Sequence, residues 1–153
     1  MIQRIQSLYL LVVAILFVSV LFCPIMNFSQ AETMFELTIN GIEKINSNPV
    51  FVLMQTPLLT ALCFIIVVIS ILTIFCYKNR ILQLRLTIFN IVLMVGYYAL
   101  LAVYLYVATK DYEVELYPRL GIIFPLIGAI LSYLAFRAIA KDEALVQRLN
   151  RLR

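Results

Sequence analysis

The stretch TPLLTALCFIIVVISILTIFC, residues 56–76, decides the fold of this chain because it carries no charged side chain over its whole length. A helix needs ~20 apolar residues to cross the roughly 30 Å hydrocarbon core of a bilayer. An unpaired backbone amide in lipid costs several kcal/mol, and a helix satisfies all of its amides within one segment. Residues 56–76 are therefore predicted to cross a membrane as a helix.

Three further apolar stretches are similar to this one, at residues 7–26, 86–108 and 118–136, and none has a charge in its middle. The chain has 153 residues, of which 64% are hydrophobic and 13% charged. A water-soluble domain of this size could not bury so much apolar surface. We therefore predict an all-α membrane protein, with residues 1–153 forming one domain that is an antiparallel bundle of four transmembrane helices.

The distribution of lysine and arginine predicts the orientation of these spans. Basic residues near the ends of spans concentrate on the cytoplasmic side of a membrane. Three basic residues lie on the outer side, which has the loop 27–55 and the short loop before the fourth span, namely Lys44, Lys110 and Arg119. Nine lie on the other side, namely Arg4, Lys78, Arg80, Arg85, Arg137, Lys141, Arg148, Arg151 and Arg153. We therefore predict that both the N-terminus and the C-terminus are cytoplasmic.

The first outer loop, residues 27–55, contains the alternating segment FELTINGIEKI at residues 35–45. Its Asn40-Gly41 dipeptide suits a type I′ turn, whose two central residues need positive φ, so the pattern allows a short β-hairpin. Because an isolated hairpin is marginally stable in water, it would have to rest on the helix ends or on the bilayer surface. We favour a cap over the helices, and the alternative is a contact site for an outer partner.

The C-terminal segment is predicted to be an amphipathic tail, residues 137–153, on the cytoplasmic face of the membrane. Three leucines recur at i, i+4 and i+7 with arginines beside them, which is typical of a helix on an anionic lipid surface. The same residues suit docking to a partner protein, whereas so small a basic cluster without aromatic residues disfavours nucleic acid. The predicted membrane-surface or partner-docking residues are Arg137, Lys141, Leu145, Arg148, Leu149, Arg151, Leu152 and Arg153.

Small and polar residues within the spans predict how the helices pack. Asn90 is the costliest polar residue there, and we expect it to form a hydrogen bond to a neighbouring helix. Gly121, Pro125, Gly128 and Ser132 recur on one face of the fourth span. Lipid supplies no hydrophobic force between helices, so small residues that let backbones approach closely are what join them. This face suits packing within the chain or against a second copy, and Pro125 is expected to bend the helix.

The residue inventory limits the chemistry that the chain can perform. There is no histidine, the commonest general base and metal ligand. The three cysteines, Cys23, Cys63 and Cys76, form no C-x-x-C pair. A bridge between Cys23 and Cys63 is conceivable, but we favour three buried thiols that act as small apolar side chains. We predict no catalytic residue, no cofactor and no metal site.

The two ends of the chain, MIQRIQSLYLL and KDEALVQRLNRLR, with four spans between them, resemble a family of small four-span Bacteroidota inner-membrane proteins classed as a domain of unknown function. The resemblance covers the whole chain. Asn150 stands before the final Arg-Leu-Arg, where the family pattern often has an aspartate. The resemblance implies an inner-membrane protein whose outer side is the periplasm, and it implies no activity.

These features favour a non-enzymatic integral inner-membrane protein that is an accessory or scaffold subunit of a larger membrane complex. Its expected partners are the lipid bilayer and either other membrane proteins or a second copy of itself, and not nucleic acid. The alternative is a small dimeric transporter of lipophilic or lipid-like substrates. Small multidrug exporters use a membrane-embedded carboxylate for proton exchange, and these spans contain none.

Overall fold

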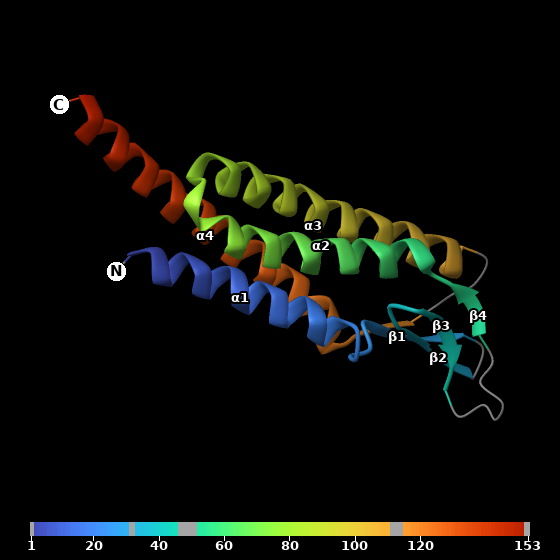
Figure 1. Cartoon of the computed structure of the whole chain (residues 1–153). Coiled ribbons are helices and arrows are strands. Elements are labelled where there is room, and N and C mark those ends of the chain that lie inside the picture. The colour runs from blue at the N-terminus through green and yellow to red at the C-terminus, as the bar shows by residue number, and fades with distance from the viewer. Residues whose placement is uncertain (1, 31–32, 46–51, 111–114, 152–153) are drawn as a thin grey trace.

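In Figure 1 the helices lie side by side and a β-sheet covers one end of them. The computed structural model describes residues 2–30, 33–45, 52–110 and 115–151, and the side-chain surroundings of residues 7–29, 33–45, 54–77, 79–110 and 115–145. The helices within this part are α1 (Ile2–Val20), α2 (Pro57–Phe75), the short 3-10 helix η1 (Cys76–Lys78), α3 (Arg80–Thr109) and α4 (Leu120–Arg151). The strands are β1 (Met26–Gln30), β2 (Thr33–Leu37), β3 (Gly41–Lys44), β4 (Val52–Gln55) and β5 (Glu115–Pro118).

The helices form a ring in which α1 packs against α2 and α4, and α3 packs against the same two helices. The start of α1, the connection between α2 and α3, and the end of α4 all lie at one end of the bundle, which we call the connection end (Figure 1). The sheet lies at the opposite end, which we call the sheet end. The described part of the chain thus passes up and down the bundle, and each long helix packs mainly against two others.

Three of these helices are long and apolar enough to cross a membrane, over Pro57–Phe75, Arg80–Thr109 and Leu120–Leu145. The apolar segment of α1 is shorter, Ser7–Val20, within the residues that the structure describes. Many large apolar side chains on the helices point outward rather than into the bundle. These properties are compatible with a membrane protein. The first predicted span, residues 7–26, extends too far. The helix α1 ends at Val20, and Met26, the last residue of the predicted span, belongs to β1.

The sheet makes the prediction of an all-α fold wrong. Its strand order is β4-β3-β2-β1-β5, and every neighbouring pair is antiparallel. β5 comes from the loop before α4, yet it pairs with β1, in the register Met26↔Pro118 and Asn27↔Tyr117. Such a pairing joins segments far apart in the sequence, so hydrophobic periodicity within either segment does not reveal it.

The hairpin that the alternating pattern allowed is present, as the β2–β3 pair of this larger sheet. Leu37 pairs with Ile42, and the Thr38 N–H donates a hydrogen bond of 2.9 Å to the Gly41 carbonyl oxygen. The two residues at the centre of the turn are therefore those at positions 39 and 40. This is one residue earlier than the expected Asn40-Gly41 turn.

One face of the sheet is apolar and continues the core of the bundle. The rings of Phe28 and Phe35 stack with their centroids 5.5 Å apart. Met26, Leu37 and Ile42 are buried with them, in one core that also contains side chains of α1, α2 and α3. An antiparallel sheet with one apolar face needs such a surface to cover. The sheet is therefore a lid on the bundle and not a separate domain.

The turn between β2 and β3 is fastened to the start of α2. The hydroxyl groups of Thr56 and Thr60 donate hydrogen bonds of 2.8 Å and 2.7 Å to the Ile39 carbonyl oxygen. The Thr56 N–H donates a further bond of 3.2 Å to the Asn40 carbonyl oxygen. Three bonds thus hold the turn against the first residues of a candidate membrane helix.

Candidate functional site

The start of α4 approaches the segment between α1 and β1 backbone to backbone. The Gly121 N–H donates a hydrogen bond of 3.2 Å to the Pro24 carbonyl oxygen. A Cβ atom at Gly121 would lie 2.5 Å from that oxygen and 2.9 Å from the Ile25 Cα, closer than real Cβ contacts come. Only glycine fits at this position. The small-residue face predicted from the sequence therefore packs within the chain at its first residue.

The rest of this face also packs within the chain. A Cβ atom at Gly128 would lie 3.0 Å from Cε2 of Phe17 on α1. The Ser132 hydroxyl lies 3.7 Å from the Met94 sulfur on α3. Pro125 is buried as well, and α4 runs through it as one helix. The sequence left open whether this face contacts the same chain or a second copy, and here it contacts α1 and α3.

The interior near the connection end is polar. Asn90 on α3 donates a hydrogen bond of 2.8 Å from Nδ2 to the Ser70 hydroxyl on α2. Its Oδ1 atom is buried and has no hydrogen-bond partner. Thr73, Gln83 and Thr87 are buried on the same two helices. We call these five residues the polar layer. The sequence predicted the interhelical bond of Asn90, but Gln83 lay outside the expected span.

The interior toward the sheet end is apolar and aromatic. The Phe17 and Tyr97 rings meet edge to face with centroids 6.0 Å apart. The Cys63 thiol lies 3.5 Å from the Phe17 carbonyl oxygen. Met94 and Leu101 are buried beside them. We call these five residues the aromatic layer. Large side chains therefore fill the space between the helices at this level.

All three cysteines are free thiols. Cys63 is buried, whereas Cys23 and Cys76 are partly exposed. The bridge between Cys23 and Cys63 that the sequence allowed is not formed. The favoured interpretation, a buried small apolar side chain, holds for Cys63 and only in part for the other two.

The predicted docking tail is the last part of α4 and continues the helix without a break to Arg151. The Arg80 guanidinium at the start of α3 donates a bond of 3.5 Å to the Asp142 carbonyl oxygen, so the residues beyond Asp142 extend past the α2–α3 connection (Figure 1). Asp142 is 8% exposed. Of the predicted docking residues, Arg137, Lys141 and Leu145 are exposed, whereas the side chains of Arg148, Leu149, Arg151, Leu152 and Arg153 lie outside the described ones.

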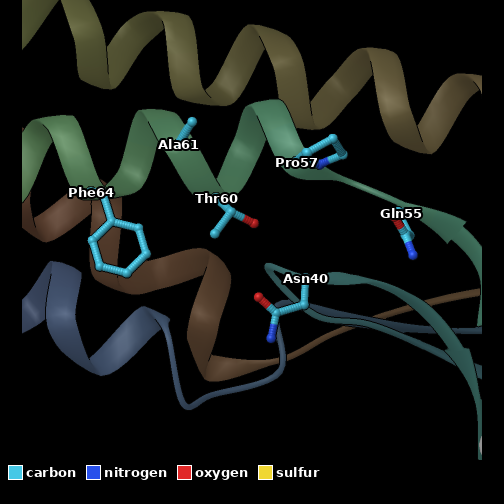
Figure 2. A pocket seen from close by; sticks show the side chains of 6 residues that line it. All are labelled: Asn40, Gln55, Pro57, Thr60, Ala61 and Phe64. Atoms are coloured by element: carbon cyan, nitrogen blue, oxygen red, sulfur yellow. The ribbon is translucent and has the colours of Figure 1, made fainter.

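At the sheet end, two hollows are lined by residues that the structure describes. The first, between the β2–β3 turn and α2, has a volume of about 390 Å³ (Figure 2). Its lining residues are Asn40, Gln55, Pro57, Thr60, Ala61 and Phe64. The Thr60 hydroxyl is already bonded to the Ile39 carbonyl oxygen. Among the residues that line this hollow, Asn40 and Gln55 have exposed amide side chains.

The second hollow has a volume of about 330 Å³ and is lined by Asn27, Met34, Tyr117 and Arg119, and we call it the β1–β5 pocket. Asn27 and Tyr117 are direct partners across β1 and β5. Asn27 is 5% exposed, and its Oδ1 atom has no hydrogen-bond partner. A buried acceptor without a partner is rare and calls for an explanation.

Tyr117 interacts with its neighbour in β5. Its hydroxyl donates a hydrogen bond of 2.5 Å to Oε2 of Glu115. This bond, together with the negative charge of the Glu115 carboxylate, raises the pKa of Tyr117 above its ordinary value. The phenol is therefore neutral at physiological pH. The sequence did not predict a role for this tyrosine in a pocket, because the pairing of β1 with β5 that creates the pocket is not visible in local patterns.

The described residues offer no group of three or more histidine, cysteine or acidic side chains placed to hold a metal ion. The apolar exterior, the filled interior and the sheet at one end define a class of protein, a helical bundle compatible with a membrane and capped by an antiparallel sheet. The chain belongs to the family described as Domain of unknown function (DUF4293), whose model matches residues 2–152. This confirms the resemblance to a family of unknown function. No curated protein and no solved structure matches the chain.

Proposed function

We propose that this protein is a non-enzymatic integral protein of the bacterial inner membrane and an accessory or scaffold subunit of a larger membrane complex. The main observation behind the proposal is that α4 extends from the sheet end to beyond the connection end of the bundle. At its start, the Arg119 and Gly121 N–H groups bond to carbonyl oxygens of the segment that leads into β1. Near its other end, Arg80 bonds to the Asp142 carbonyl oxygen. One helix thus connects a folded sheet at one end to an extension at the other.

Under this proposal, potential contact surfaces lie on both sides of a membrane. Within the bilayer, outward-pointing apolar side chains on the helices suit contact with lipid or with the helices of a partner. The extension carries Leu145, which is 46% exposed, and the leucine stripe predicted from the sequence continues from it. A helix face of this kind suits a hydrophobic groove on a partner.

The filled interior supports a scaffold rather than a transporter. Phe17, Met94 and Tyr97 are each fully buried between the helices, where a substrate path through a single chain would have to run. Transport by a dimer would therefore have to use the outer faces of the helices. Flux assays on purified protein in liposomes test this alternative, and robust substrate-driven flux would favour it over the scaffold.

The proposed orientation has both termini in the cytoplasm and the sheet in the periplasm. It is supported by the nine basic residues on the side of the termini, against three on the other side. We expect alkaline phosphatase, which is active only in the periplasm, to be inactive when fused after Arg153 and active when inserted between residues 46 and 51. The reverse pattern would contradict the orientation.

The scaffold role is tested by mild detergent extraction and mass spectrometry of the proteins that copurify. We expect a reproducible companion that is lost when Leu145, Leu149 and Leu152 are all changed to serine, with recovery falling about tenfold or more. The matched control changes Ala144, Gln147 and Asn150 to serine in the same turns, and the companion should remain. A wild-type protein that runs only as a lone monomer would refute the proposal.

A further inference from the structure

We infer that the β1–β5 pocket binds the headgroup of an aminophospholipid, with the phosphate on Arg119 and the primary ammonium on Asn27. This inference rests on the membrane embedding proposed above. The pocket volume of about 330 Å³ falls within the usual range of small-ligand sites, roughly 300–1,000 Å³. Each end of the pocket contributes a different half of the recognition.

The position of the pocket selects a lipid as its occupant. Arg119 immediately precedes Leu120, the first residue of a candidate membrane helix. The charged and aromatic residues that flank a span lie at the level of the headgroups. Leu120, which follows Arg119, is 66% exposed, which suits contact with the first carbons of acyl chains. A phospholipid headgroup is therefore the most abundant polar ligand at this level.

Arg119 supplies the site for the phosphate. Its backbone is fixed, because its N–H donates a hydrogen bond of 3.2 Å to the Ile25 carbonyl oxygen. In the part of the chain that the structure describes, no carboxylate forms an ion pair with its guanidinium, and Glu115 instead accepts the bond from Tyr117. A guanidinium binds phosphate through charge-assisted, often paired hydrogen bonds.

Asn27 supplies the site for the ammonium. Its Oδ1 atom is buried and accepts no hydrogen bond from the protein, so an N–H donor in the pocket would remove the cost of burying it. Glu36 is its direct partner on β2, and Glu43 is the direct partner of Glu36 on β3. Directly opposed residues project from the same face of a sheet, so negative charge is concentrated on this side of Asn27.

Arg119 thus lines the pocket as a cation, and the acidic residues Glu36 and Glu43 lie beyond Asn27 on β2 and β3. Phosphatidylethanolamine matches both halves. Phosphatidylglycerol has the phosphate and lacks the ammonium. Phosphatidylcholine carries a quaternary ammonium, which has no N–H to donate to Oδ1 of Asn27. Discrimination between ethanolamine and choline headgroups is therefore the most specific consequence of this geometry.

The test is native mass spectrometry of the full-length protein, delipidated and then offered equal amounts of the three lipids in mixed micelles. We expect retention of phosphatidylethanolamine about tenfold above phosphatidylcholine, because a hydrogen bond to a charged group contributes about that factor or more. Arg119→Gln should lose retention of phosphatidylethanolamine and phosphatidylglycerol alike. Asn27→Leu, which is close to isosteric, should lose only the discrimination between ethanolamine and choline.

Two control variants keep the test specific. Lys110→Gln removes an exposed cation at the same end of the molecule, and Asn40→Leu removes an exposed amide from the other hollow. Both should retain lipid as the wild type does. Soluble phosphoethanolamine, which lacks acyl chains, should not displace the lipid at equal concentration. Displacement by it would mean that the ligand is a soluble metabolite and would overturn the lipid assignment.

Equal retention of the three lipids, or unchanged retention by Arg119→Gln, would overturn the inference. The same preparations separate this failure from a failure of the proposed function. A protein that pellets with membranes and keeps its companion, but shows no headgroup preference, refutes the pocket alone. A protein that stays in solution when membranes are pelleted refutes both proposals.

Discussion

The two layers of the bundle interior differ in how they hold the helices together. In the aromatic layer, Phe17 of α1 contacts Tyr97 of α3 and lies against Gly128 of α4, so one side chain joins three helices. In the polar layer, the bond from Asn90 to Ser70 joins only two. The aromatic layer also lies toward the sheet, whose apolar face continues the same core.

All three hydroxyl groups of the polar layer bond to their own helix. Ser70, Thr73 and Thr87 each donate to the carbonyl oxygen four residues earlier, at 2.8, 2.6 and 2.8 Å. Such bonds satisfy the hydroxyl group without joining one helix to another. Because lipid supplies no hydrophobic force between helices, close packing is the main source of their association. We therefore expect stability to be concentrated toward the sheet end, and three experiments test this difference.

The largest effect is expected in the aromatic layer. Phe17→Ala should lower the free energy of unfolding by about 3 kcal/mol, because it empties a fully enclosed site. Phe22→Ala is the matched control, since that phenylalanine is 82% exposed. Reversible unfolding in mixed micelles measures both. Equal effects of the two changes would show that burial in this layer does not carry the stability.

A smaller loss is expected where α4 meets the segment before β1. Gly121→Ala would bring a methyl group within 2.5 Å of the Pro24 carbonyl oxygen, so the backbones must separate, at a cost of about 2 kcal/mol. The control is Gly96→Ala, where an added Cβ meets nothing within 4 Å. The control should be neutral or gain up to about 1 kcal/mol from helix propensity. Loss of stability in both variants would point to helix flexibility rather than to close approach.

The smallest effect is expected in the polar layer. A double-mutant cycle with Asn90→Ala and Ser70→Ala isolates the coupling between the two side chains, which we expect to be about 0.6 kcal/mol, the average for interhelical hydrogen bonds in membranes. The single variants and the double variant are unfolded under the same conditions as before. A coupling larger than the effect of Phe17→Ala would reverse the proposed difference between the layers.

The candidate membrane helices were predictable because the cost of placing a side chain in lipid depends mainly on that side chain. Residues 56–76 were expected as a span, and α2 occupies Pro57–Phe75. Gly121 and Gly128 were expected on a packing face, since spacing along a helix places them together. Their partners, Pro24 and Phe17, were not predictable, because the spacing of residues along one helix does not determine which segment that helix contacts.

The sheet was mostly missed for a related reason. The segments MNFSQ and ELYP are short and show no clear alternation, so only their pairing with each other makes them strands. The alternating segment after Phe35 did predict the β2–β3 pair, because both of its strands are local in sequence. The β1–β5 pocket was not predicted at all, since Asn27 and Arg119 lie far apart in the sequence.

Reading the residues in order was enough to predict the apolar helices and the small-residue face of α4, because each depends on composition or spacing within one segment. The motifs at the two ends of the chain were enough to indicate the family. The five-stranded lid, the one-residue shift of its turn and the pocket beside Arg119 required the folded chain. These features arise from hydrogen bonds and contacts between segments far apart in sequence. The free energy of these contacts arises only when the two segments meet, so neither segment by itself indicates the pairing.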